Sequence, residues 1–253
     1  MLNHAAIAIT RGLLRQRNPL VHNLTSAVVA NFTANVLLAI GASPAMVESE
    51  DEVVAFAAAT DALVINLGSL TPQRGAVMRL AAISASTAGT PWILDPVGAG
   101  AIGPRTEFAR ALALLRPTAI RGNASEIVSL AGGPASGRGI DSGAASDAAT
   151  GAAMRLARDT GAIVAVTGQV DYVADGDRLQ AFVQGHPLMA AVTGMGCAAT
   201  AIIAACLAVH ASPVEAVAQG LSISAQAGEA AARLAAGPGS FQALYLDALA
   251  GPG

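Results

Sequence analysis

The chain has 253 residues and a formal net charge of -3; 53% of its residues are hydrophobic and only 12% are charged. This composition excludes a disordered chain and supplies enough apolar side chains for a sizeable core. The sequence holds no basic block, so we expect no nucleic-acid partner.

Short apolar segments alternate with longer Ala-rich segments of helical periodicity along most of the chain. Residues 1–17 lack the long apolar core and cleavage site of a secretion signal, so we expect no such signal there. We expect these residues to form a first helix instead. Apolar segments bounded by Gly, Pro or polar residues predict strands at 19–24, 43–47, 61–68, 91–97, 118–123 and 162–168. The periodic segments between them predict helices at 26–41, 51–60, 73–89, 105–116, 124–132 and 147–161.

The remaining segments complete an α/β pattern. Residues 171–176 and 178–184 predict a hairpin at an antiparallel edge, residues 132–146 a surface loop, and the last 60 residues mostly helix. Strands that are apolar on both faces and alternate with helices imply a mainly parallel central sheet covered by helices on both faces. We find no linker, so we expect one domain over residues 1–253.

Two long stretches without charged residues, 18–47 and 179–214, raise the possibility of a membrane protein. Pro, Gly and Asn interrupt both, and neither holds the apolar run of about 18 residues that a spanning helix needs. We therefore expect no membrane partner. The two cysteines, Cys197 and Cys206, are nine positions apart and fall on opposite faces of a helix, so they can neither bridge nor share a metal. Free thiols fit a reducing, cytoplasmic compartment.

Several candidate site residues follow strands, where ligands bind in a parallel sheet. The carboxyl ends of the predicted strands carry Asn23, Met46, Gly68, Asp95, Arg121 and Thr167, and the turn 193–197 opens a later helix. Asp95 could order a metal-bound water or cap a turn. Arg121 could grip a phosphate, and Glu126 could hold Mg²⁺ through water. The alternative is a surface Arg, a capping Asn123 with Glu at the third helical position, and a Thr167 that only serves a turn.

Two glycine-rich segments differ in what they predict. The sequence "GAGAIG" (98–103) has a dinucleotide-binding pattern, but Pro104 follows at once and nothing marks it as a first strand–helix turn, so we interpret it as a decoy. In "VTGMGC" (192–197), Gly194 and Gly196 allow backbone N–H groups to converge on an anion at a helix N-terminus. A tight turn that packs a buried cysteine is the alternative.

All 14 basic residues are Arg. A Walker A lysine and a Schiff-base lysine are therefore excluded.

Six segments occur in an order typical of one enzyme family: "PLVHNLTSAVVANFTANVLLAIGASPAMV", "LVINLGSL", "PWILDPVGAGA", "RGNASEI", "RGIDS" and "AVTGMGCAATA". Together they resemble the ribokinase-like superfamily and, within it, the hydroxyethylthiazole kinases of thiamine biosynthesis and salvage. The resemblance covers nearly the whole chain. It implies a three-layer sandwich without a β lid, and phosphoryl transfer from ATP, with Mg²⁺, to a thiazole alcohol.

The resemblance also implies roles for individual residues. Met46 and Gly194 match positions that contact the thiazole. Arg121 and Thr167 match positions that contact ATP, and Asp95 and Glu126 are similar to the acidic pair near Mg²⁺. The family is typically a homotrimer with sites between subunits, which would use the apolar excess of this chain.

Cys197 stands where most ribokinase-like enzymes have Asp as the general base, although some hydroxyethylthiazole kinases also carry Cys there. A helix N-terminus lowers a thiol pKa, whereas phosphate charge raises it, so we expect the thiolate to be a minority species at neutral pH. Phosphoryl transfer depends mainly on positioning and electrostatics, so a weak base is compatible with activity.

Three alternatives remain at this point. The chain could be a ribokinase-like kinase for a hydroxymethylpyrimidine, pyridoxal or a sugar. It could be the related NAD(P)H-hydrate dehydratase, although that lyase is expected to keep Asp after its glycines. It could also be a binding module without turnover, which the joint presence of Asp95, Arg121 and Glu126 disfavours.

Overall fold

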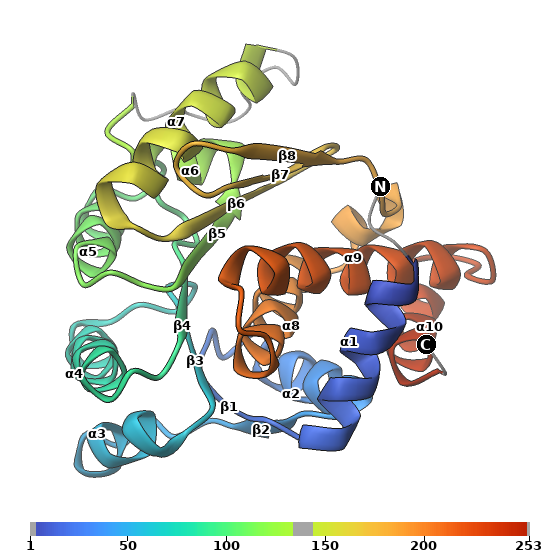
Figure 1. Ribbon diagram of the computed structural model, residues 1–253, viewed down its shortest axis with the longest axis horizontal. Coiled ribbons are helices and arrows are strands. Elements are labelled where there is room, and N and C mark those ends of the chain that lie inside the picture. The colour runs from blue at the N-terminus through green and yellow to red at the C-terminus, as the bar shows by residue number, and fades with distance from the viewer. Residues whose placement is uncertain (1–3, 134–143, 252–253) are drawn as a thin grey trace.

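An eight-stranded sheet forms the centre of the computed structural model, which describes residues 4–133 and 144–251 (Figure 1). The strands are β1 (Leu20–Leu24), β2 (Ser43–Ala45), β3 (Ala62–Asn66), β4 (Trp92–Asp95), β5 (Ala119–Asn123), β6 (Ile163–Thr167), β7 (Asp171–Ala174) and β8 (Leu179–Phe182). Their spatial order is β2-β1-β3-β4-β5-β6-β7-β8. Strands β1 to β6 are parallel, and β7 and β8 pair antiparallel, which confirms the predicted mainly parallel sheet and its hairpin edge.

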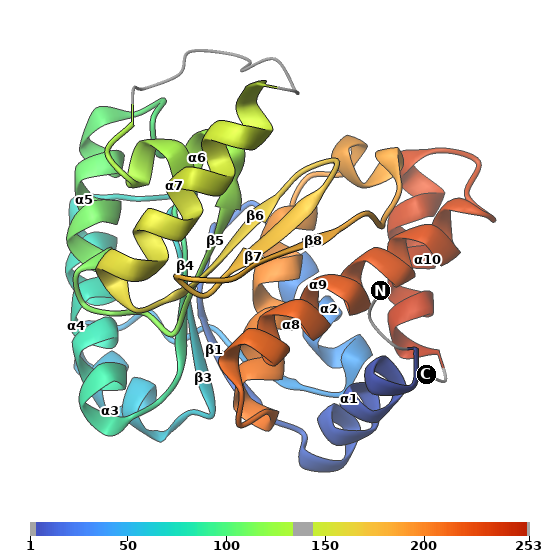
Figure 2. The ribbon, with the colours of Figure 1, turned by 45° about the horizontal axis from the view of Figure 1, so that its top comes forward.

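Helices cover both faces of this sheet, as predicted (Figures 1 and 2). One face carries α1 (His4–Arg17), α2 (Ala30–Ile40), α8 (Met195–Val209), α9 (Pro213–Ala232) and α10 (Pro238–Ala250). The other face carries α3 (Glu50–Ala59), α4 (Pro72–Ala88), α5 (Gly103–Ala113), α6 (Ala124–Leu130) and α7 (Ala144–Thr160). A short 3₁₀ helix, η1 (Pro187–Ala191), leads from β8 towards α8.

The strands divide their apolar side chains between two cores because successive residues of a strand point to opposite faces. In β3, Val64 packs with the α8 side, whereas Leu63 and Ile65 pack with the α4 side. All five residues of β3 are buried, as expected for an interior strand of a covered parallel sheet.

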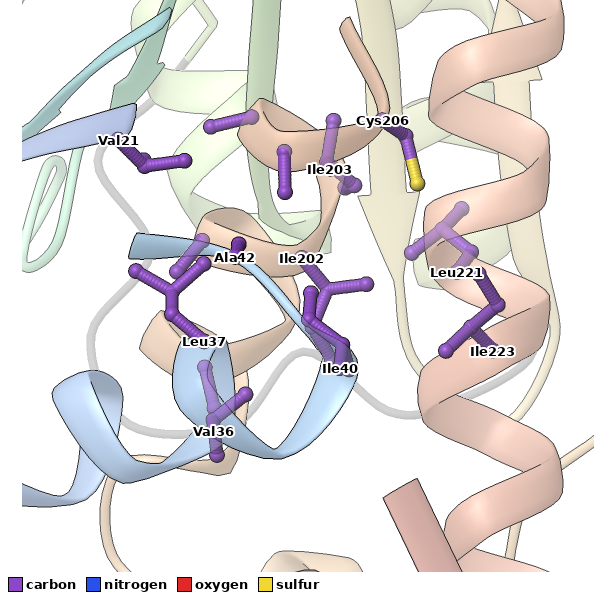
Figure 3. Close-up of a cluster of buried hydrophobic side chains, with 14 of the residues drawn as sticks. Val21, Val36, Leu37, Ile40, Ala42, Ile202, Ile203, Cys206, Leu221 and Ile223 are labelled. Carbon is purple, nitrogen blue, oxygen red and sulfur yellow. The ribbon is translucent and has the colours of Figure 1, made fainter. Parts of the chain in front are cut away.

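Helix α8 is buried almost all round, and its alanines allow close packing. It lies between the sheet and its neighbours α2 and α9, where Ile202, Ile203 and Cys206 meet apolar side chains of both (Figure 3). At the crossing with α9, a Cβ atom on Gly220 would lie 2.8 Å from the Ile203 Cα, so only glycine fits there. Cys206 is fully buried, Cys197 is partly exposed and both are free thiols, which confirms that they do not bridge.

Three helix boundaries among the described residues differ from the expected ones by three residues or more. Helix α2 begins at Ala30 instead of residue 26, because Ser26 bonds to Ser69 and to the Val28 N–H and turns the chain there. Helix α5 ends at Ala113 instead of 116, since Pro117 disfavours helical backbone before it and Arg116 has φ +58°. Helix α7 begins at Ala144, inside the predicted loop 132–146, and residues 134–143 of that loop lie outside the described residues.

No helix in the described ranges is both long enough and apolar enough to cross a membrane. The two uncharged stretches are instead divided among strands, turns and core helices. Pro44 lies in the edge strand β2, where a missing N–H donor is tolerated.

Candidate active site

Asp95 lies at the centre of a group of polar side chains at the carboxyl ends of β3 to β6. It ends β4, and none of its surface is exposed. Its Oδ2 atom is 2.8 Å from Asn66 Nδ2 and 2.8 Å from Thr200 Oγ1, and both groups donate to it. Arg121 Nη1 lies 3.9 Å from the same oxygen. Asp95 Oδ1 is buried and has no hydrogen-bond partner among the described residues, so it can still accept from a ligand or a water.

Burial raises the pKa of Asp95 to about 6, because the desolvated carboxylate is costly. The Arg121 charge opposes this rise and the Glu126 charge adds to it, while the hydrogen bonds from Thr200 and Asn66 lower the pKa. Above this pH the ionised Asp95 carboxylate is held by nearby donors and one cation, and its burial lowers the free energy of unfolding.

Cys197 lies in the first turn of α8, beside Asp95. Asn66 Nδ2 donates to its Sγ atom over 3.1 Å. Burial raises the pKa of the Cys197 thiol to about 12, and the Asp95 charge acts in the same direction. The Asn66 hydrogen bond and Arg121 act against this rise, but they do not cancel it. The thiol is therefore protonated at neutral pH, and the helix N-terminus does not produce a reactive thiolate here.

Arg121 joins this group to a cleft of about 860 Å³, here called the Arg121 cleft. Arg121, Thr167 and Gly196 line one side of it, the segment 183–190 lines another, and α9 contributes Ser224 and Glu229. The Arg121 guanidinium donates from Nη2 to the Thr167 hydroxyl. It also lies against the backbone of α8, since a Cβ atom on Gly196 would be 2.6 Å from Nη1.

Glu126 is 8% exposed and uses both carboxylate oxygens inside the protein. Oε2 accepts from the Asn123 N–H at 2.9 Å, and Asn123 Oδ1 accepts from the Glu126 N–H, which is a complete capping box. Oε1 accepts from the Gly98 N–H at 3.0 Å. The capping interpretation of Asn123 and Glu126 is thus confirmed, and a metal role for Glu126 stays a prediction.

The "GAGAIG" segment forms the turn between β4 and α5 and satisfies its backbone internally. The Gly98 N–H bonds to Glu126, and the Gly100 N–H donates to Thr106 Oγ1 at 2.7 Å. A Cβ atom on Gly100 would lie 2.2 Å from the Ser129 hydroxyl oxygen, so this glycine serves a close approach between the turn and α6. These contacts agree with our interpretation of the segment as a decoy.

Met46 lies away from the Arg121 cleft, whereas Gly194 directly precedes Met195, which is one of the residues that line it. Gly194 precedes α8 with φ +89°, and a Cβ atom there would be 2.8 Å from Val29 Cγ1, so the position requires glycine. Met46 follows the edge strand β2, which four strand spacings separate from β5. At about 4.8 Å per spacing, this is roughly 19 Å. Four of the predicted site residues thus lie together: Asp95, Arg121, Thr167 and Cys197. Met46 lies apart from them, at the β2 edge of the sheet.

Asn66 and Thr200 are site residues that the sequence interpretation missed. Asn66 is the last residue of β3, and the strand-end argument could have selected it in place of Gly68. The Gly68 N–H donates to Asn66 Oδ1 at 2.9 Å, so this glycine belongs to the same turn. Thr200 is a lone hydroxyl in an Ala-rich helix, one turn after Gly196, and no local pattern indicates its contact with Asp95.

The acidic side chains fit a magnesium ion that is held jointly with a phosphate. Among the described residues, no group of three or more His, Cys, Asp or Glu side chains could hold a metal ion. Mg²⁺ in nucleotide sites is usually held by one or two carboxylates together with phosphates and waters. The free, buried Oδ1 atom of Asp95 suits such a water-mediated contact.

Comparisons with known proteins agree on one family. A model described as "Hydroxyethylthiazole kinase family" matches residues 12–251. The chain is 56% identical over 237 residues to a hydroxyethylthiazole kinase of Granulibacter bethesdensis, which is 94% of this chain and 86% of that relative.

Solved structures give the same result. The chain resembles a hydroxyethylthiazole kinase protein from Pyrococcus horikoshii OT3 with a TM-score of 0.88 and 39% identity, over 96% of this chain and 92% of that one. A ribokinase-like superfamily protein from Enterococcus faecalis V583 aligns with a TM-score of 0.69 and 13% identity, over 98% and 95% of the two chains. The second likeness concerns the fold alone and agrees with a ribokinase-like α/β architecture.

The buried carboxyl group predicts how stability depends on pH. A raised pKa means that the folded state holds the Asp95 proton more tightly than the unfolded state, in which the pKa is about 3.9. The Asp95 contribution to stability therefore falls as pH rises from about 4 to about 6. We expect Asp95→Asn to remove this fall and to raise the free energy of unfolding above pH 6 by up to about 3 kcal/mol.

Denaturant unfolding in metal-free buffer between pH 4 and pH 8 measures this effect. Asp177→Asn, in the exposed β7–β8 turn, serves as the matched control. Parallel pH curves for native protein and Asp95→Asn would contradict the prediction.

Proposed function

Because this chain belongs to the hydroxyethylthiazole kinase family, we propose that it transfers a phosphoryl group from ATP to the primary hydroxyl of 4-methyl-5-(2-hydroxyethyl)thiazole. The reaction would depend on Mg²⁺ and would supply thiazole phosphate for thiamine synthesis or salvage in the cytoplasm. The observation that carries this proposal is the position of Arg121, between an open cleft and the buried Asp95, which has Cys197 beside it. A cation at such a boundary suits a phosphate in transfer.

We propose that the Arg121 cleft binds ATP. Arg121 would contact phosphate oxygens through its planar donors, and Thr167, which already accepts from Arg121, would add a hydroxyl. The backbone N–H groups of residues 194–197 open α8, where the helix dipole favours an anion. These groups together would stabilise the charge on the transferring phosphoryl group.

Asp95 and Glu126 would hold Mg²⁺ through water, beside the nucleotide phosphates. The ion would neutralise negative charge on the phosphates, because the protein places few cations beside them. Asp95 has a free oxygen for this contact. Glu126 would contribute mainly through its charge, since each of its oxygens already accepts a backbone N–H.

Cys197 would act as a weak base towards the hydroxyl group of the alcohol. A thiol with a pKa of about 12 is a poor proton acceptor at neutral pH. In a loose phosphoryl-transfer transition state the proton of the attacking alcohol leaves late, so the reaction depends little on base strength. Arg121 and the α8 amides would then supply most of the rate enhancement.

We propose that the active enzyme is a homotrimer with sites between subunits, in which Met46 and Gly194 contact the thiazole. The distance between Met46 and the Arg121 cleft supports this arrangement, because a neighbouring subunit could bring a second Met46 to the site. Apolar side chains in α2 and just before it are open to solvent in the single chain: Val28 is 77% exposed and Leu38 60%. Such side chains favour a protein interface.

An ATP-consumption assay, with and without the thiazole alcohol, tests the function. Alcohol-dependent ADP release with Mg²⁺, and its loss with EDTA, are expected. Hydroxymethylpyrimidine, pyridoxal and ribose serve as competing acceptors in the same assay. Preference for one of them would redirect the proposal to another kinase, and nucleotide binding without turnover would refute it.

The proposed trimer predicts the mass in solution. Light scattering should give three times the 25.0 kDa of the chain. Val28→Asp, which places a charge in the exposed apolar region, should lower both the mass and the turnover. A monomer with full activity would contradict shared sites.

The position of Arg121 predicts an effect on nucleotide binding. Loss of a hydrogen bond to a charged group costs about 1.5–3 kcal/mol, so Arg121→Ala should raise the KM for ATP roughly tenfold to a hundredfold. The KM for the alcohol should change less. Gly196→Ala should act in the same direction, because its methyl group would displace the guanidinium.

Gly151→Ala in α7 is the matched control, since its Cβ atom would approach only Arg155, at 3.9 Å. An unchanged KM for ATP in both Arg121→Ala and Gly196→Ala would assign Arg121 a structural role.

The weak base predicts the behaviour of Cys197 variants. Cys197→Asp should keep or raise kcat, since a carboxylate is ionised far more often than this thiol, and Cys197→Ala should keep clear residual activity. General-base catalysis contributes roughly 10²–10⁴-fold, and we expect the low end here. The native rate should rise towards alkaline pH, and the Asp variant should be flatter above neutrality. Loss of activity in a folded, ATP-binding Cys197→Asp protein would contradict a base at this position.

A further inference from the structure

We propose that Asn66 is a positioning residue of this site: its side-chain amide holds the Cys197 sulfur and the Asp95 carboxylate together, with one hydrogen donated to each. The inference rests on the proposed function only for its effect on turnover. The bridge itself can be tested without any substrate.

The orientation of the Asn66 amide is fixed at both ends. Its Oδ1 atom accepts from the Gly68 N–H at 2.9 Å, and a backbone N–H can only donate. Its Nδ2 atom faces Asp95 Oδ2 at 2.8 Å, and an ionised carboxylate can only accept. A flipped amide would place two donors or two acceptors against each other at both contacts. The assignment of nitrogen and oxygen therefore follows from the chemistry of the neighbours.

Both amide hydrogens then have a partner. One serves Asp95 and the other serves Cys197 Sγ, 3.1 Å away. Asn66 is only 1% exposed, so water has little access to replace either bond. Since Sγ accepts from Asn66, the hydrogen of the thiol is left to point elsewhere, for example towards an acceptor in the site.

The bridge also offsets the repulsion between two groups that can both be negatively charged. Asp95 and an ionised Cys197 carry like charges in a desolvated place, and Arg121 is the one guanidinium among the described residues that contributes to the pKa of both. The Asn66 NH₂ group presents a positive dipole end to each of them. Without it, we expect the sulfur to lose its donor and the thiolate to become rarer.

Two apolar replacements of similar branched shape separate the bridge from a purely structural role. Asn66→Leu removes the donors to Asp95 and Cys197, whereas Thr200→Val removes a donor to Asp95 at the same 2.8 Å and leaves the Asn66–Cys197 contact in place. Both variants are made in a Cys206→Ala background, so that Cys197 is the only thiol. Thermal unfolding checks that both fold.

The first readout is the rate at which iodoacetamide alkylates Cys197 at pH 9, without nucleotide. Asn66→Leu should slow this rate roughly tenfold to a hundredfold, the effect of one hydrogen bond to a charged group. Thr200→Val should not slow it, because this variant leaves the Asn66 hydrogen bond to the Cys197 sulfur in place. Should Asn66→Leu fail to fold, Asn66→Asp keeps the acceptor for the Gly68 N–H, adds an acidic group and should also slow the reaction.

The second readout is kcat with ATP and the thiazole alcohol. Asn66→Leu should lower kcat while Cys197 is present. When Cys197 is replaced by Ala, the further loss caused by Asn66→Leu should shrink to the loss that Thr200→Val causes. Such a double-mutant cycle isolates the contact between Asn66 and the sulfur.

The two readouts fail in different ways. If alkylation is as fast in Asn66→Leu, or in the Asn66→Asp substitute, as in the Cys206→Ala protein without these changes, the bridge is refuted, whatever the activity. If alkylation slows but the native protein does not phosphorylate the alcohol, the bridge stands and the proposed function falls. Equal kcat losses with and without the sulfur overturn the catalytic part of the inference.

Discussion

The buried carboxylate of Asp95 is the constraint on which the rest of the site depends. A charge with no exposed surface must be surrounded by donors, and those donors come from different parts of the chain: Asn66 from β3, Arg121 from β5 and Thr200 from α8. Each of these elements must therefore keep its register relative to β4. The pairing of Asn66 with Asp95 across β3 and β4 meets this demand directly.

The sheet and α8 together create the place where this charge is held. Parallel pairing from β2 to β6 brings the strand ends to one edge, and the Ala-rich α8 packs close enough for its first turn to reach that edge. Bulkier residues along α8 would push its N-terminus, with Cys197 and Gly196, away from Asp95 and Arg121. The packing of the core thus sets the geometry of the chemistry.

In the proposed reaction, this arrangement would favour catalysis by charge and position over catalysis by a strong base. Burial keeps the Cys197 thiol protonated, while the same burial strengthens the field of Arg121 and of the backbone amides around it. The cost appears as a raised Asp95 pKa, which means that part of the folding energy is given up to keep a carboxylate in the site. Enzymes commonly hold this kind of strain at the place where they act.

The sequence by itself determined the α/β class, the alternation of strands and helices, the hairpin edge and the family. These follow from apolar periodicity and from motifs in a fixed order, which are local properties of the chain. It also selected Asp95, Arg121 and Thr167, since each lies near the carboxyl end of a predicted strand. Tertiary structure alone decided that Asn66 and Thr200 complete the environment of Asp95, and that Met46 lies far from them across the sheet. It also decided the thiol pKa, because desolvation depends on everything that packs around Cys197, and residues distant in sequence supply that packing.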